Sequence, residues 1–156
     1  MDKIAAPKET EIYGVTEFDL KEIETDGGPV LHMMRADGPM FERFGEIYFS
    51  VVLPGAVKAW KRHRMQTQHL AVPVGLVDIV VYDSRPDSPT HGKLARFQLG
   101  RPGNYRLLRI PPGLWYGFTG KSAEPSVLAN CVDIPHAPEE SERLPKDTDR
   151  IPFRWE

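Results

Sequence analysis

The sequence predicts an all-β domain, built as a barrel or jelly roll, on two observations. First, its 13 glycines and 15 prolines fall mostly between short runs of aliphatic and aromatic residues, which is typical of strands joined by turns. Second, these runs do not show an extended helical period. With 156 residues, 40% of them hydrophobic and 27% charged, the composition suits one globular domain spanning residues 1–156.

Each expected strand ends at a turn signal, such as Asp-Gly-Gly-Pro at residues 26–29 or Arg-Pro-Gly-Asn at residues 101–104, because Gly permits positive φ and Pro presets φ. The run Leu76–Asp83 is apolar except for Asp78, which indicates a strand buried between two sheets. The expected strands are Gly14–Ile23, Val30–Arg35, Glu46–Leu53, Val57–His63, His69–Val74, Leu76–Tyr82, Leu94–Leu99, Arg106–Ile110, Trp115–Thr119 and Ser126–Val132.

The composition changes after Val132. Residues 134–156 combine prolines with charges of both signs and end in Ile-Pro-Phe-Arg-Trp-Glu. Phe153 and Trp155 are large apolar side chains that need cover, so we expect this tail to pack on the barrel of its own subunit or on a partner.

Charge and composition exclude several classes of partner. A net charge of -2 and an isoelectric point near 6.2 argue against nucleic acid binding, which needs clustered excess Lys and Arg. The sequence lacks the roughly 18 consecutive apolar residues of a membrane span, and its start lacks the apolar segment of a signal peptide. Cys131 is the only cysteine, so an internal disulfide and a Cys-rich zinc site are excluded. We therefore expect a cytoplasmic protein.

Cationic and polar side chains alternate with apolar ones between Gly55 and Gly75, so Lys61 and His63 share one face of the expected strand. The spacing matches the first motif of the cupin jelly roll, Gly, five residues, His-x-His, four residues, Glu, six residues, Gly. The metal-ligand positions of that motif are occupied here by Lys61, His63 and Gln68.

The second cupin motif, Pro-x-Gly-x-x-His, has a counterpart at residues 111–116, with Tyr116 in the histidine position. A protonated lysine has no lone pair to offer, and an amide oxygen and a neutral phenol are weak ligands, which leaves His63 as the only good donor for a transition metal. The sequence therefore predicts a cupin-type jelly-roll barrel, or double-stranded β-helix, that binds no metal and uses no cofactor.

Three blocks of the sequence, Gly55–Lys61, Gly75–Lys93 and Ile110–Phe118, resemble the dTDP-4-dehydrorhamnose 3,5-epimerase family. The resemblance extends over roughly residues 13–155. It implies a homodimer of jelly-roll subunits and a site for a nucleotide-linked 4-keto-6-deoxy sugar. In such a site a base removes the acidic proton beside the ketone, and an acid returns a proton to the opposite face.

The catalytic set that the resemblance implies is largely replaced. The catalytic histidine falls on Lys61, a second histidine on Tyr116, and the acid tyrosine near Ala129. The aspartate that partners the catalytic histidine belongs to a C-terminal stretch that we expect this chain to lack, and an arginine near the opening strands falls on Gly28. The expected substrate-binding positions are Lys58, which replaces an arginine, Gln68, which replaces a lysine, and Glu46, Tyr48 and Asn130.

The remaining polar residues still suit proton transfer. Lys61 could act as the base if burial and neighbouring positive charge lower its pKa. His63 could act as the base without such tuning, and Tyr116 could act as the acid. Lys61 could also form a Schiff base with a keto sugar.

Two alternative functions stay open on this scaffold. One is an isomerase, lyase or cyclase for a small non-nucleotide carbonyl compound, which the loss of the arginine at Gly28 favours. The other is a binding module that keeps the barrel without catalysis. Fold alone does not separate them.

Overall fold

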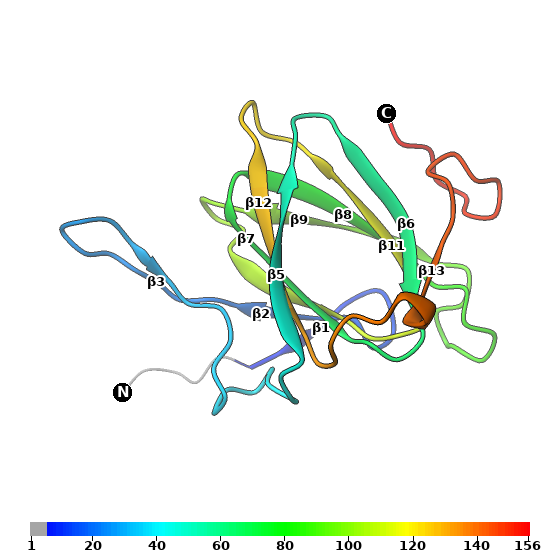
Figure 1. Ribbon diagram of the computed structural model, residues 1–156, viewed down its shortest axis with the longest axis horizontal. Helices are drawn as coiled ribbons and strands as arrows, with labels where there is room; N and C mark the ends of the chain where they lie inside the picture. The colour runs from blue at the N-terminus through cyan, green and yellow to red at the C-terminus, as the bar shows by residue number, and fades with distance from the viewer. Residues whose placement is uncertain (1–5) are drawn as a thin grey trace.

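The computed structural model describes residues 6–156 and consists of two antiparallel sheets facing each other (Figure 1). One sheet has the strand order β1-β2-β10-β7-β12-β5 and the other β13-β6-β11-β8-β9. The strands of the first sheet are β1 (Lys8–Glu9), β2 (Thr16–Asp19), β10 (Arg106–Ile110), β7 (Gln68–Val74), β12 (Ser126–Val132) and β5 (Glu46–Val52). Those of the second are β13 (Ser141–Arg143), β6 (Val57–His63), β11 (Trp115–Gly120), β8 (Leu76–Tyr82) and β9 (Leu94–Gly100). The predicted all-β jelly roll is confirmed.

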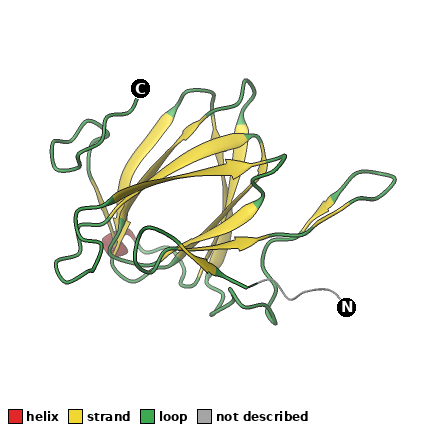
Figure 2. Cartoon of the chain, turned by 180° about the vertical axis from the view of Figure 1, so that it is seen from behind, coloured by secondary structure: helices red, strands yellow, loops and turns green. Residues whose placement is uncertain are grey.

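Two further strands, β3 (Glu22–Ile23) and β4 (Val30–Leu31), form a separate hairpin that projects from the barrel (Figure 2). The sequence predicted one strand over Gly14–Ile23, but the structure divides it, because β2 pairs with β10 whereas β3 leaves the sheet to pair with β4. The prediction for Val30–Arg35 was also too long, since β4 ends at Leu31. The predictions missed β1 and β13.

The core lies between the two sheets. Alternate residues of each strand point inward, as Ala95, Phe97 and Leu99 of β9 do. Strand β8 contributes Val77, Ile79 and Val81 to the same core. Burial of these side chains is what holds the two sheets together.

The outer face of β8 is covered by the C-terminal segment rather than by a second sheet, which corrects the prediction for this run. Val80 points outward and packs with Trp60, Trp115 and Ile151, and the side chains of Phe153 and Trp155 lie against this cluster. The Trp155 ring centroid is 5.2 Å from that of Trp60. The near-continuous apolar run of β8 follows from having both faces covered.

The C-terminal segment also returns to the barrel edge. A single 3₁₀ turn, Pro138–Glu140, leads into β13, which pairs with β6 in the register Ser141 to His63 and Arg143 to Lys61. No helix within residues 6–156 is long and apolar enough to cross a membrane.

Candidate active site

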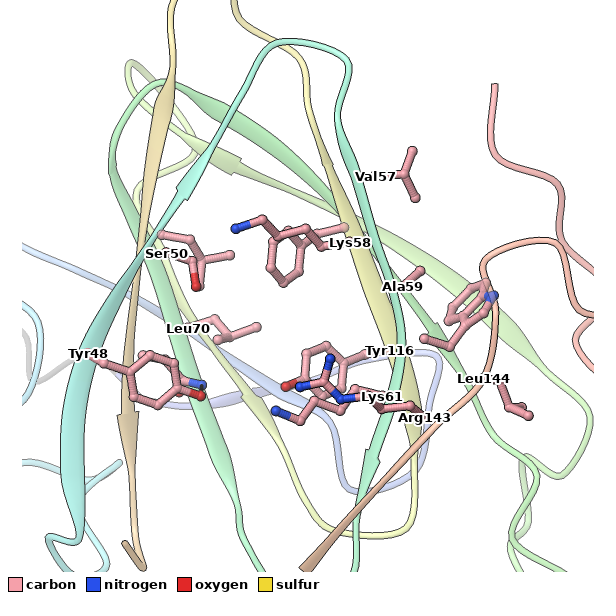
Figure 3. A pocket seen from close by; sticks show the side chains of 14 residues that line it. Tyr48, Ser50, Val57, Lys58, Ala59, Lys61, Leu70, Tyr116, Arg143 and Leu144 are labelled. Carbon is pink, nitrogen blue, oxygen red and sulfur yellow. Dashed lines mark hydrogen bonds between the residues drawn. The ribbon is translucent and has the colours of Figure 1, made fainter. Parts of the chain in front are cut away.

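A cavity of about 410 Å³ opens between the two sheets. The six-stranded sheet lines it with residues of β5, β7 and β12, and the five-stranded sheet lines it with residues of β6, β11 and the β13 edge. The polar and charged lining residues are Tyr48, Ser50, Lys58, Lys61, Tyr116, Asn130 and Arg143 (Figure 3).

Lys61 is the central cation of this cavity. It lies on β6 between Tyr116 of β11 and Arg143 of β13, its partners in the two neighbouring strands. Within residues 6–156 its ammonium group forms no ion pair with a carboxylate. Burial and the neighbouring Arg143 lower the pKa of Lys61, although Glu140 opposes the shift. A lysine in this setting is suited to act as a base.

Two further cations share the wall with Lys61. The Lys58 ammonium donates a hydrogen bond to the carbonyl oxygen of Val51 at 2.9 Å. Arg143 lines the cavity and, among the described residues, has no carboxylate within ion-pair distance. A wall with three cations and no facing carboxylate favours an anionic ligand.

His63 forms a hydrogen-bonded pair with Glu140, with 2.7 Å between Nδ1 and Oε1. Both side chains are buried, and the second oxygen of Glu140 accepts hydrogen bonds from the backbone N–H groups of Met65 and Gln66. Burial lowers the pKa of His63 against the effect of Glu140, so the ring is neutral. Although burial alone would raise it, these hydrogen bonds hold the pKa of Glu140 below its usual value. The pair is therefore a neutral imidazole oriented by a carboxylate.

The far ring nitrogen of His63 faces Tyr116 and begins a polar network across the barrel. Its Nε2 lies 3.3 Å from the Tyr116 hydroxyl, which also lies 3.3 Å from Oε1 of Gln68. The Asn130 amide donates to the same Gln68 oxygen and, at 3.0 Å, to the hydroxyl of Tyr48. This network links the two sheets through side chains that are mostly buried.

The structure brings together seven of the eight predicted site residues. Lys58, Lys61, Tyr116, Tyr48 and Asn130 line the cavity. His63 and Gln68 do not line it but lie directly behind, hydrogen-bonded to Tyr116.

Glu46 is the exception, because it does not line the cavity. Its carboxylate accepts a hydrogen bond from the backbone N–H of His136 and so ties the C-terminal segment to β5. Its predicted contact with substrate has no support in this position.

Glu140 and Arg143, which both come from the C-terminal segment, were not among the predicted site residues. The chain was expected to lack the stretch that supplies a carboxylate to the catalytic histidine, yet Glu140 provides a carboxylate to His63. The sequence offers no local signal for either residue, because Ser141-Glu142-Arg143 is polar throughout and shows no alternation. Within residues 6–156 no group of three or more His, Cys, Asp or Glu side chains is placed to hold a metal ion.

Known proteins resemble this chain over nearly its whole length. It is 36% identical over 148 residues to the probable low-salt glycan biosynthesis epimerase Agl13 of Haloferax volcanii, covering 92% of this chain and 94% of that protein. The chain belongs to the dTDP-sugar epimerase family. A crystal structure of a dTDP sugar isomerase from Desulfovibrio desulfuricans is 57% identical, with a TM-score of 0.92, covering 93% of this chain and 92% of that one. No family model matches the sequence.

The cupin fold of the family is shared beyond these relatives. The dTDP-4-dehydrorhamnose 3,5-epimerase of Elizabethkingia anophelis is 17% identical and superposes with a TM-score of 0.81, covering 98% of this chain and 87% of that one. By the resemblance described above, the catalytic histidine of the family aligns with Lys61 of this chain. In this member the histidine that pairs with a carboxylate is His63, two residues further along the same face of β6.

Proposed function

We propose that this protein epimerises a nucleotide-linked 4-keto-6-deoxy sugar by proton transfer next to the carbonyl, without a metal. The observation that carries the proposal is the position of Lys61 in the cavity: it is a cation with a lowered pKa and has no carboxylate partner among the described residues. The nucleotide-linked substrate is proposed because the chain is 57% identical to a dTDP sugar isomerase. Removing a proton beside a ketone needs a base whose pKa lies near the working pH.

The other wall cations support the nucleotide part of the proposal. A guanidinium group is suited to bind a diphosphate. The arginine that the resemblance implies near the opening strands is replaced here by Gly28. Arg143 provides a guanidinium at the cavity from a different part of the chain. This observation favours a nucleotide-linked substrate over a small non-nucleotide carbonyl compound.

The test is proton exchange in deuterium oxide with dTDP-4-keto-6-deoxyglucose, followed by NMR of the sugar ring. We expect deuterium at the carbons beside the ketone with the native protein and with Lys146→Met, an exposed control lysine. We expect at least a 100-fold slower exchange with Lys61→Met. Exchange that survives Lys61→Met removes Lys61 as the base. If the native protein neither exchanges nor binds the substrate, the proposed function is wrong.

We also propose a homodimer that forms through the outer face of β5. Ile47, Phe49 and Val51 are exposed on one side of this strand, which is an edge strand of its sheet. Such an exposed apolar face is suited to pack against the same face of a second copy about a two-fold axis. Light scattering should give twice the subunit mass for the native protein and the subunit mass for Phe49→Glu. A monomeric native protein would exclude the dimer.

A further inference from the structure

The two walls of the cavity carry different chemistry. The wall from the five-stranded sheet holds the cations Lys58, Lys61 and Arg143. The wall from the six-stranded sheet holds hydroxyl and amide groups, from Tyr48, Ser50 and Asn130 on β5 and β12. Figure 3 shows Tyr48 and Lys61 on opposite sides of the cavity, with their polar ends pointing toward each other.

Inversion of a carbon centre beside a ketone needs groups on both faces of the sugar ring. A base on one face removes the proton, and an acid on the other face returns one. We propose that Tyr48 is this acid and works opposite Lys61, an assignment that rests on the proposed function and adds a catalytic residue to it.

The hydrogen bonds around Tyr48 leave its own proton free to be donated. The Asn130 side chain is oriented by the backbone N–H of His69, which donates to its Oδ1 at 3.1 Å. The amide nitrogen of Asn130 must therefore face the other way, and it donates to the Tyr48 hydroxyl oxygen at 3.0 Å. The Tyr48 hydroxyl accepts this hydrogen bond, so its O–H can point into the cavity.

The same contact favours the transition state of protonation. Burial raises the pKa of Tyr48 more than the hydrogen bond from Asn130 lowers it, so the phenol holds its proton at neutral pH. A strongly basic enolate can remove that proton. As negative charge develops on the Tyr48 oxygen, the hydrogen bond from Asn130 becomes stronger and stabilises the phenolate. Asn130 is a positioning residue in this step.

The other hydroxyl groups of the cavity are poorer donors. Tyr116 is buried, and its hydroxyl lies between two acceptors, His63 Nε2 and Gln68 Oε1. Burial raises the pKa of Tyr116 far above its usual range. The aliphatic hydroxyl of Ser50 is a much weaker acid than a phenol. Tyr48 is thus the phenol of the described lining residues whose proton is not already committed.

Tyr48 reaches the cavity from β5, the strand next to β12. The resemblance implies an acid tyrosine near Ala129 on β12, but strand alternation turns the buried Ala129 side chain away from the cavity, which Leu128 and Asn130 line instead. In the structure β12 pairs with β5, and Asn130 lies opposite Tyr48 in the register. The phenol of Tyr48 therefore enters the cavity beside Asn130, the residue whose amide donates to its hydroxyl.

The proposed step is balanced without any further reagent. The Lys61 amine takes the proton from the carbon beside the ketone, and the electron pair moves to the carbonyl oxygen to form an enolate. The Tyr48 hydroxyl gives its proton to the opposite face of that carbon, and the ketone re-forms. The ammonium group returns its extra proton to water, and the phenolate takes one from water.

The test is Tyr48→Phe in deuterium oxide with dTDP-4-keto-6-deoxyglucose, measuring two rates by NMR. One is deuterium incorporation into recovered substrate, and the other is formation of the epimer. Because a lysine ammonium group carries solvent deuterons, it can return one to the face from which it took the proton. We expect epimer formation to fall at least 100-fold while exchange in the substrate stays within about 10-fold of the native rate.

Two variants make the result specific. Tyr116→Phe should lower exchange and epimer formation in the same proportion, because it alters the network but not the donor. Tyr105→Phe removes a distant phenol that donates to the carbonyl oxygen of His32 and should leave both rates unchanged.

Three outcomes would overturn the assignment. Tyr48→Phe could form epimer within about threefold of the native rate, or it could lose exchange and epimer formation equally, which would indicate a positioning role. A native protein that shows neither activity would instead overturn the proposed function, and the assignment of Tyr48 with it.

Discussion

Replacing Arg143 with glutamine should shift the pH at which the enzyme becomes active. Arg143 and Lys61 are direct neighbours in the β13–β6 register, so their Cβ atoms lie about 5 Å apart. With the two charges about 7 Å apart and an effective dielectric constant between about 20 and about 80, their repulsion is on the order of 1 kcal/mol. Without Arg143 the pKa of Lys61 rises, because its charged form is no longer opposed.

The assay is the pH dependence of kcat/KM, which reports the free enzyme. In the proposed mechanism the active form has neutral Lys61, so kcat/KM rises with pH, and its rising limb should move to higher pH in Arg143→Gln. At a pH below the rising limb, the loss of about 1 kcal/mol of repulsion lowers kcat/KM about fivefold, because less of Lys61 is neutral. Arg143→Lys keeps the charge and should keep the limb in place. A limb that does not move in Arg143→Gln would refute the electrostatic coupling, whatever the change in KM.

Three further predictions concern stability. Glu140→Gln weakens the hydrogen bonds to His63 and two backbone N–H groups and should lower the free energy of unfolding by about 2 kcal/mol in a urea titration. Trp155→Ala uncovers Trp60 and should cost about 2 kcal/mol, whereas Lys146→Ala on the exposed surface should cost less than about 0.5 kcal/mol. Because burial lowers the pKa of His63, the unfolded state binds more protons below pH 6.5, so stability should decline as the pH falls from about 6.5 to 5. Urea titrations at pH 7 and pH 5 should show this decline, and His63→Asn should reduce it.

The barrel could be predicted from the sequence because its strands carry strong local signals. The runs Val57–His63, Leu76–Tyr82, Arg106–Ile110 and Ser126–Val132 match β6, β8, β10 and β12 residue for residue. Each contains aliphatic or aromatic side chains and is followed by a turn or bend. The short strands β1 and β13 were missed because two or three polar residues carry no period, and they form only by pairing with a strand that already exists.

The site was predictable in part, for a similar reason. Strand alternation places Lys61 and His63 on one face, so their proximity follows from the sequence. The contribution of Glu140 depends on a 3₁₀ turn docking 77 positions along the chain from His63, which local patterns do not encode. Which residues line the cavity and which lie behind it also depends on packing, and this is why Glu46, predicted to bind substrate, lies outside the cavity lining.

The C-terminal segment both supplies residues to the site and covers an apolar face of the barrel. Residues 138–144 supply Glu140 and Arg143 to the site, and residues 151–155 cover the aromatic face of β8 and β6. A protease cut after Val132 would therefore remove the site residues Glu140 and Arg143 together with the cover over Trp60. Such a fragment would expose Trp60 and its apolar neighbours, so loss of the site would be accompanied by loss of stability.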